Sequence, residues 1–335
     1  GDPTTLKLDA HNWNATWSMT DISVYNTVNL TSGSGGGAIL DIDKKNFTGG
    51  GEVKLTGNQK NKGNPDMAVN TKGNLVAVWD VDNSADGAPD YDIYGNIIDT
   101  ATGQPGQEFV ITNSKRNETR PRVAALSDGD FAVVWIDDGT DTGNAVTIQM
   151  AIFNSTGILK TSCKIGADTD NKGNPDIAAD GEGKILVVWE DHGNALDFDI
   201  LGHYYNSSGV GTGGDLKIGA TSKDERNPVV TSFDKNMYMV AWQRYNDPTG
   251  SEAGWNINGS IVKDASLTPF PIRAAVDEQM NPCIASYPGL PQVAVAWREM
   301  PTDKQKGDAN ISAILVNVSG DVSGNKIDVA NITAW

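Results

Sequence analysis

A proline followed fourteen residues later by a tryptophan recurs along the whole chain, and this repeat limits the possible folds more than any other feature. The pairs are Pro3 and Trp17, Pro65 and Trp79, Pro121 and Trp135, Pro175 and Trp189, Pro228 and Trp242, and, with one extra residue, Pro282 and Trp297. Successive tryptophans are 62, 56, 54, 53 and 55 residues apart. Self-similarity of this period is typical of repeat architectures such as solenoids and propellers. The chain therefore consists of six related copies.

Each copy has the pattern of four short strands. The first strand begins at the proline, which suits this place because it has no N–H to donate to a neighbouring strand. The second is almost continuously apolar, as in "KILVVWED", which predicts burial on both faces. The third alternates, as in "YDIYGNII", and the fourth is shorter and more polar, as in "EFVITN". The 37 glycines and the turn-forming residues between these runs favour strands over long helices.

A four-stranded unit of this size cannot bury both of its faces alone, whereas radial stacking of such units buries them in a ring. We therefore predict an all-β fold, a single six-bladed β-propeller domain over residues 1–335 with four-stranded antiparallel blades. The predicted blades are 1–62, 63–118, 119–172, 173–225, 226–279 and 280–335. The recurrent tryptophans are predicted to be buried between neighbouring blades.

The two ends of the chain predict how the ring closes. Pro3 opens a first strand, and "NKIDVANITAW" supplies the fourth strand of the last copy. Because the chain begins and ends at a blade boundary, we predict closure by packing, without a strand-swapped blade. Residues 330–335 extend past the expected strand end, and they either pair with the first blade or add to a neighbouring subunit. The alternative is a frayed terminus.

The run "P-x-h-A … G … h-V-V-W-x-D … D-h-D-I" resembles the TolB-like and WD40-like propeller repeats of secreted and cell-surface proteins of archaea and bacteria. Copies two to six match this run well, and the first copy carries a long insertion. The resemblance implies the fold and an extracellular or cell-surface location. It does not imply an activity, because propellers serve in binding, scaffolding and catalysis. The chain lacks the Gly-His…Trp-Asp signature of true WD40 blades and the Ser-x-Asp-x-Gly-x-Thr-Trp box of sialidases.

The net charge and the lack of long apolar runs argue against two classes of partner, nucleic acid and the membrane interior. The net charge of −17 repels phosphate backbones and anionic lipids, so we expect no nucleic acid partner. No apolar run approaches the ~20 residues that span a bilayer, so we expect no membrane insertion. Cys163 and Cys283 fall in an outer strand of copy three and an inner strand of copy six. They are predicted to lie farther apart than the ~7 Å between Cα atoms that a disulfide permits.

The loops between second and third strands are rich in carboxylates, which are ligands that calcium prefers. The candidate metal site lies in copy two, at Asp80, Asp82, Asp90 and Asp92. Their spacing does not follow the EF-hand pattern, and aspartates in turns commonly bond to their own backbone. A solvated acidic surface is therefore the alternative. Calcium is the one candidate cofactor.

Ten Asn-x-Ser/Thr sequons are the most distinctive surface feature. They are Asn14, Asn29, Asn46, Asn117, Asn154, Asn206, Asn258, Asn310, Asn317 and Asn331. The strongest candidates for glycosylation are Asn46, Asn154, Asn206 and Asn317, which are predicted at the turn between third and fourth strands. Glycans there would mean that the protein is exported. The alternative is that Asn-Ser-x-Gly is simply good turn chemistry.

The sequence carries no motif for catalysis. It has three histidines, no His-Glu-x-x-His and no Gly-x-Ser-x-Gly. We therefore predict a non-catalytic, exported or cell-surface propeller glycoprotein that acts as a structural, assembly or binding module. Its expected partners are further copies of itself, other surface proteins or carbohydrate.

Two alternatives stay open. One is a carbohydrate-active hydrolase or lyase that uses carboxylates on the propeller face. The other is a lectin-like module in which Tyr91, Tyr245 or Trp255 stacks on sugars. A catalytic site would break the symmetry between copies, whereas a scaffold would keep equivalent positions alike.

Overall fold

The computed structural model describes most of the chain from residue 54 onward and two short strands before it. The described residues are 29–32, 38–41, 54–57, 60–84, 90–100, 102–138, 146–166, 171–193, 197–246, 254–275, 277–286, 290–301, 309–320 and 322–330. Trp17, the sequons at Asn14, Asn46 and Asn331, and the terminal residues 331–335 lie outside them.

Five antiparallel sheets form from copies two to six, and we call each sheet a blade and number it by its copy. Blade two contains β3 (Lys62–Val69), β4 (Asn74–Asp82), β5 (Tyr91–Asp99), β6 (Gln104–Pro105) and β7 (Phe109–Thr112). Blade three contains β8 (Asn117–Ala125), β9 (Phe131–Asp138), β10 (Thr147–Phe153) and β11 (Leu159–Ile165). Blade four contains β12 (Asn171–Ala179), β13 (Ile185–His192), β14 (Asp199–Tyr205) and β15 (Gly211–Gly219). Blade five contains β16 (Glu225–Asp234), β17 (Met237–Asn246), β18 (Gly254–Lys263) and β19 (Ser266–Arg273). Blade six contains β20 (Glu278–Ser286), β21 (Gln292–Met300), β22 (Asn310–Asn317) and β23 (Val322–Ala330).

The prediction of an all-β fold from four-stranded antiparallel units is confirmed. In blades three to six the four strands pair in the order of the chain, and in blade two both β6 and β7 pair with β5. The count differs from the predicted six, because the described residues form five such sheets. From the first copy they include a two-stranded ribbon, β1 (Asn29–Ser32) and β2 (Ala38–Asp41).

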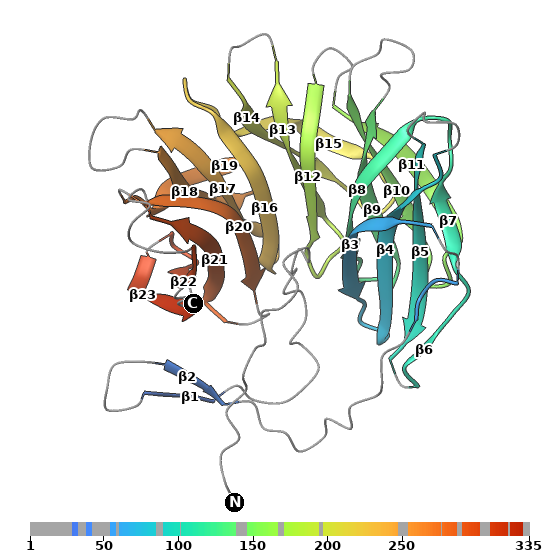
Figure 1. The fold of residues 1–335 in the computed structure, drawn as a ribbon, viewed down its shortest axis with the longest axis horizontal. Coiled ribbons are helices and arrows are strands. Elements are labelled where there is room, and N and C mark those ends of the chain that lie inside the picture. Colours follow the sequence, from blue (N-terminus) through green and yellow to red (C-terminus); the bar gives the residue numbers. More distant parts are fainter. Residues whose placement is uncertain are drawn as a thin grey trace, which may run out of the picture.

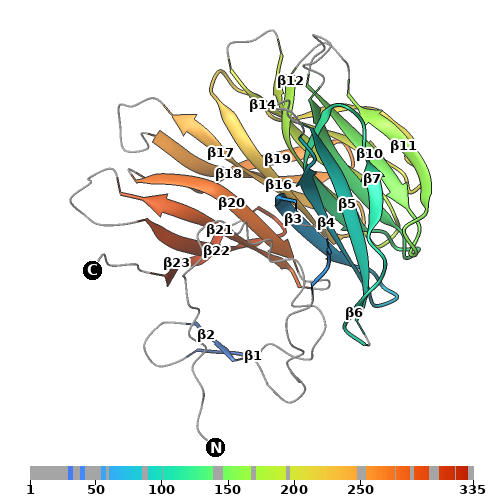
Figure 2. The same ribbon diagram turned by 45° about the vertical axis from the view of Figure 1, so that its right-hand side comes forward.

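The five blades stand side by side in an arc, with their first strands toward the middle (Figure 1). Contacts join the first strands of successive blades, from β3 to β8, β12, β16 and β20. Blades two and six lie at the two ends of the arc, and the ribbon of β1 and β2 lies apart from the sheets in both views (Figure 2). Within the described residues, no helix is long and apolar enough to cross a membrane.

The tryptophans of copies two to six occupy equivalent places and are at most 5% exposed, as predicted. Trp189 shares a core cluster with Ile148 and Ile165 of blade three. Trp242 shares one with Ile200 of blade four. The tryptophans of blades three to six thus pack against the preceding blade, which removes a large apolar surface from water and holds neighbouring blades together.

A bulge interrupts each first strand at its proline. The residue before the proline has a positive φ in every described blade: Asn64 (44°), Arg120 (54°), Asn174 (43°), Asn227 (52°) and Asn281 (53°). The pairing with the second strand shifts at this point, for example between Gly63 and Asp66. Asparagine enters the left-handed region more readily than other residues with a side chain, which explains its recurrence before proline.

Candidate functional site

In each blade the second strand connects to the third at one end, and the connections between blades lie at the same end. We call this end the upper face. The opposite, lower face carries the turns between first and second strands and between third and fourth strands. Buried polar groups gather near the upper ends of the strands.

A belt of hydrogen bonds links the blades along their first strands. It consists of the residue before each proline and the residue after each tryptophan. Asp80 Oδ2 accepts from Asn64 Nδ2 of its own blade at 2.7 Å and from Arg120 N of the next blade at 3.1 Å. One buried carboxylate thus joins two blades.

The same scheme recurs farther along the belt. Glu190 Oε1 accepts from Asn174 Nδ2 at 2.7 Å and from Asn227 N at 2.5 Å. Gln243 Oε1 accepts from Asn227 Nδ2 at 3.0 Å and from Asn281 N at 2.9 Å. The acceptor oxygen after the tryptophan therefore provides a hydrogen-bond partner for the left-handed residues of its own blade and of the next blade.

Blade three breaks this scheme at both positions. Ile136 follows Trp135 where blades two, four and five place an acceptor, and Arg120 replaces asparagine before the proline. Blade six departs at one position only, since Arg298 follows Trp297 while Asn281 precedes the proline. The side chain of Arg120 is exposed, and its Nη1 donates to Asn174 Oδ1. The symmetry between copies is therefore lost at blade three.

A second set of equivalent positions also differs in blade three. The residue three before each proline pairs across strands with the residue two after each tryptophan. In blade four this pair is Lys172 and Asp191, whose Nζ and Oδ2 atoms are 3.4 Å apart. In blade three the pair is Glu118 and Asp137, two acids. Like charges directly opposite each other destabilise a sheet, so the fold does not explain this choice.

A third acid joins the pair from the neighbouring blade. Asp92, at the start of β5, interacts electrostatically with Glu118. We call Asp92, Glu118 and Asp137 the acid cluster; their exposed fractions are 6%, 2% and 7%. Asp92 Oδ1 and Glu118 Oε2 are buried, and neither has a hydrogen-bond partner among the described residues. Each buried carboxylate oxygen without a partner calls for an explanation, of which a catalytic role is one.

Burial raises the pKa of every member of the acid cluster. Burial raises the pKa of Glu118 to about 7, against a hydrogen bond from Ser114, and the charges of Asp137 and Asp92 raise that pKa further. Burial also raises the pKa of Asp137, but Arg116 opposes this effect with Nε at 2.7 Å from Oδ1. Below pH 7, Glu118 is therefore a proton donor, and it lies beside an acid that has a cationic partner. Two carboxyl groups in unlike environments can divide the roles of acid and base.

The predicted metal ligands are not brought together as one group. Asp80 belongs to the belt, and Asp92 belongs to the acid cluster and accepts from Asn83 Nδ2. Asp82 Oδ1 accepts from Ser84 N at 3.0 Å, and Asp90 N donates to Ser84 Oγ at 3.0 Å. Across the described residues, no group of three or more His, Cys, Asp or Glu side chains could hold a metal ion. Calcium binding stays a prediction.

Three of the strongest sequons lie where they were predicted, at turns between third and fourth strands on the lower face. Asn154 and Asn206 cap their turns, since the Oδ1 atom of each accepts from the backbone N–H groups two and four residues later. Asn317 closes a similar turn with Gly320. Asn258 is buried in β18, so its amide is out of reach of a transferase in the folded protein.

The proposed sugar-stacking residues are half-buried and do not form one group. Tyr245 and Trp255 meet edge to face in blade five, with ring centroids 5.3 Å apart. Tyr91 begins β5 in blade two. The free cysteines Cys163 and Cys283 lie in β11 and β20, the strands predicted for them.

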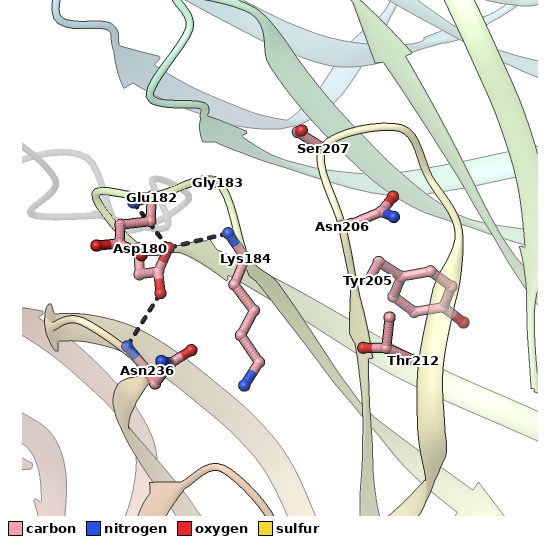
Figure 3. Close-up of a pocket in the computed structure, with 9 residues that line it drawn as sticks. All are labelled: Asp180, Glu182, Gly183, Lys184, Tyr205, Asn206, Ser207, Thr212 and Asn236. Atoms are coloured by element: carbon pink, nitrogen blue, oxygen red, sulfur yellow. Dashed lines mark hydrogen bonds between the residues drawn. The ribbon is translucent and has the colours of Figure 1, made fainter.

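A cavity of about 350 Å³ lies on the lower face, between the turn that follows β12 and the turn that follows β14 (Figure 3). Asp180 dominates one wall, but its carboxylate accepts from Lys184 N at 2.9 Å and from Asn236 N at 3.0 Å. Both carboxylate oxygens of Asp180 therefore form hydrogen bonds that stabilise the turn and its contact with the next blade. This cavity is separate from the acid cluster, which lies near the opposite ends of the strands.

Comparison with known proteins identifies the fold. No family model matches the chain, and no curated protein matches it. A protein of unknown function from Dyadobacter fermentans aligns with a TM-score of 0.54 and 11% identity, over 76% of each chain. The GH93 α-L-arabinofuranosidase of Fusarium graminearum, solved with arabinobiose, aligns with a TM-score of 0.55 and 12% identity. That alignment covers 85% of this chain and 86% of the other. The likeness shows that this chain has a β-propeller fold.

Proposed function

We propose that the protein is a carbohydrate-active hydrolase that cleaves glycosidic bonds at the acid cluster. The observation that carries the proposal is the buried cross-strand pair of Glu118 and Asp137, in which one acid titrates near neutral pH and the other faces Arg116. Glycoside hydrolysis needs such a pair, with one protonated carboxylic acid and one ionised carboxylate.

This proposal replaces our prediction of a non-catalytic structural or binding module. The comparison corrects that prediction, because the similar protein of described activity is an arabinofuranosidase solved with arabinobiose. It agrees better with the alternative, an enzyme that acts on carbohydrate through carboxylates of the propeller. The loss of symmetry at blade three supports the same alternative, because only there among the described blades do two acids pair across the first and second strands.

The chemistry follows from the two protonation states. The proton of Glu118 passes to the glycosidic oxygen as the bond between that oxygen and the anomeric carbon breaks. Water adds to the anomeric carbon and gives a proton to the carboxylate of Asp137, whose negative charge also stabilises the oxocarbenium-like transition state. Arg116 is a positioning residue whose charge favours the ionised form of Asp137, against the effect of burial.

The first test is release of reducing ends from a panel of polysaccharides, including arabinan, at pH 5 to 6. At this pH Glu118 is protonated, and we expect hydrolysis of at least one member of the panel. A folded protein that releases no reducing ends from any of them would contradict the proposal.

We further propose that the first copy completes the ring as a sixth blade of the TolB-like type. The support is its Pro3 and Trp17 spacing, which matches the copies that form blades two to five. Counting the blades in an electron-microscopy map of the full chain tests this number.

We also propose that the protein is exported and glycosylated at its lower face. Asn154, Asn206 and Asn317 lie at corresponding turns there, which supports them as acceptors. We expect the intact mass of the native protein to exceed the mass of the polypeptide, with the excess on peptides that contain these residues. A native mass equal to that of the polypeptide would contradict glycosylation.

A further inference from the structure

Arg120 occupies a position where the four other described blades have asparagine. Its φ of 54° lies in the left-handed region, which arginine rarely adopts and asparagine tolerates. The local backbone therefore favours asparagine at this place. The backbone conformation therefore does not explain arginine at this place, and its side chain is the feature to examine.

The contacts of Arg120 leave most of its guanidinium available. Its backbone N–H bonds to Asp80 Oδ2 at 3.1 Å, which any residue could do. One N–H of the side chain donates to Asn174 Oδ1. A guanidinium has five N–H donors in a planar fork, and this side chain is exposed. Donors therefore remain for a ligand.

The position of Arg120 relates it to the acid cluster. It follows Glu118 by two residues on β8, so their Cα atoms are at most about 7 Å apart, the reach of two fully extended residues. A long side chain covers that distance easily. A sugar bound for cleavage at Glu118 would thus have a neighbouring substituent within reach of the guanidinium.

We propose that Arg120 binds the carboxylate of a uronic acid residue, and that the substrate is an acidic polysaccharide. This inference rests on the proposed function and names the substrate class of the same site. A guanidinium fork matches a carboxylate with two parallel hydrogen bonds, which asparagine cannot offer to a charged group. A protein with a net charge of −17 repels polyanions, so an anionic substrate needs a local cation of this kind.

The test compares ligands that differ in charge alone. Trigalacturonate, its methyl ester and the neutral arabinotriose are titrated by calorimetry into the full chain carrying Glu118→Gln, which prevents turnover. We expect the free acid to bind about 10-fold or more tightly than the ester, as a charge-assisted bidentate contact implies. Adding Arg120→Asn, the residue of the other blades, should abolish this preference without lowering the melting temperature. Arg120→Lys should weaken it.

The outcomes separate this inference from the proposed function. Equal binding of acid and ester, a preference that survives Arg120→Asn, or binding of none of the ligands would overturn the inference. Hydrolysis of neutral polysaccharide alone by the unmodified protein would overturn it as well and leave the proposed function intact. An Arg120-dependent preference for the acid, in a protein that hydrolyses nothing, would uphold the inference as a binding site and end the proposal of an enzyme.

Discussion

Replacing Glu118 with glutamine is expected to lower kcat about 100-fold or more, because the variant has no proton to give to the leaving oxygen. In the unmodified protein, activity should fall as the pH rises through about 7, where Glu118 loses its proton. Steady-state rates from pH 4 to 9 measure both effects. Any residual activity of Glu118→Gln should lack this alkaline limb.

Glu225→Gln is the matched control for this variant. Glu225 holds the equivalent place in blade five, is fully buried and accepts from Thr221 Oγ1 at 2.5 Å, but it pairs across strands with Arg244. We expect Glu225→Gln to retain activity. Full activity in Glu118→Gln, or an equal loss in both folded variants, would show that the acid cluster is not the site.

The same substitution has a second, thermodynamic readout. A carboxyl group whose pKa is raised by folding stabilises the native state below its unfolded pKa of 4.5, and this contribution is lost as the pH rises through about 7. Glu118→Gln removes this loss. The melting temperature of the variant minus that of the unmodified protein should therefore be larger at pH 8 than at pH 5. Burial also raises the pKa of Asp176 to about 7, so the comparison between variants isolates Glu118.

Glu190→Ala is expected to lower the free energy of unfolding by about 1–3 kcal/mol, the cost of one donor left unpaired. The alanine removes the acceptor of Asn227 N and one of the two acceptors of Asn174 Nδ2, which also donates to Asn227 Oδ1 at 3.1 Å. Urea unfolding followed by tryptophan fluorescence measures the change, since a buried tryptophan marks every described blade.

Glu190→Gln keeps an acceptor oxygen and reproduces the arrangement of blade five, where Gln243 bonds to Asn227 and Asn281. Its loss of stability should be less than half of that in Glu190→Ala. If both variants lose stability equally, the charge matters rather than the acceptor. If neither does, the belt does not stabilise the ring.

The sequence predicted the blades because their physical causes are local and repeated. Burial on both faces of the second strand and a large aromatic residue at its end produce the same pattern in every copy. The first copy carries a long insertion, so the pattern alone could not show whether it completes a blade.

The candidate site could not be predicted in the same way. Asp92 stood among the candidate metal ligands of the loops, but Glu118 was hidden inside a sequon as the residue after Asn117. Its pairing with Asp137 depends on the bulge at Pro121, which shifts the register between the strands. Its approach to Asp92 depends on packing between blades two and three. A comparison of equivalent positions across copies would have shown the acid pair as an exception.

The belt also bears on how such a ring arises by gene duplication. In blades two, four and five the belt unit carries an asparagine that faces its own blade and an acceptor that serves the next blade, so the contact between blades is head to tail. A heterologous contact of this kind lets identical units be joined in any number until their rotation closes a ring. A newly duplicated blade would therefore find compatible neighbours on both sides at once. Selection could then alter one copy, as at blade three, while its neighbours preserved the architecture.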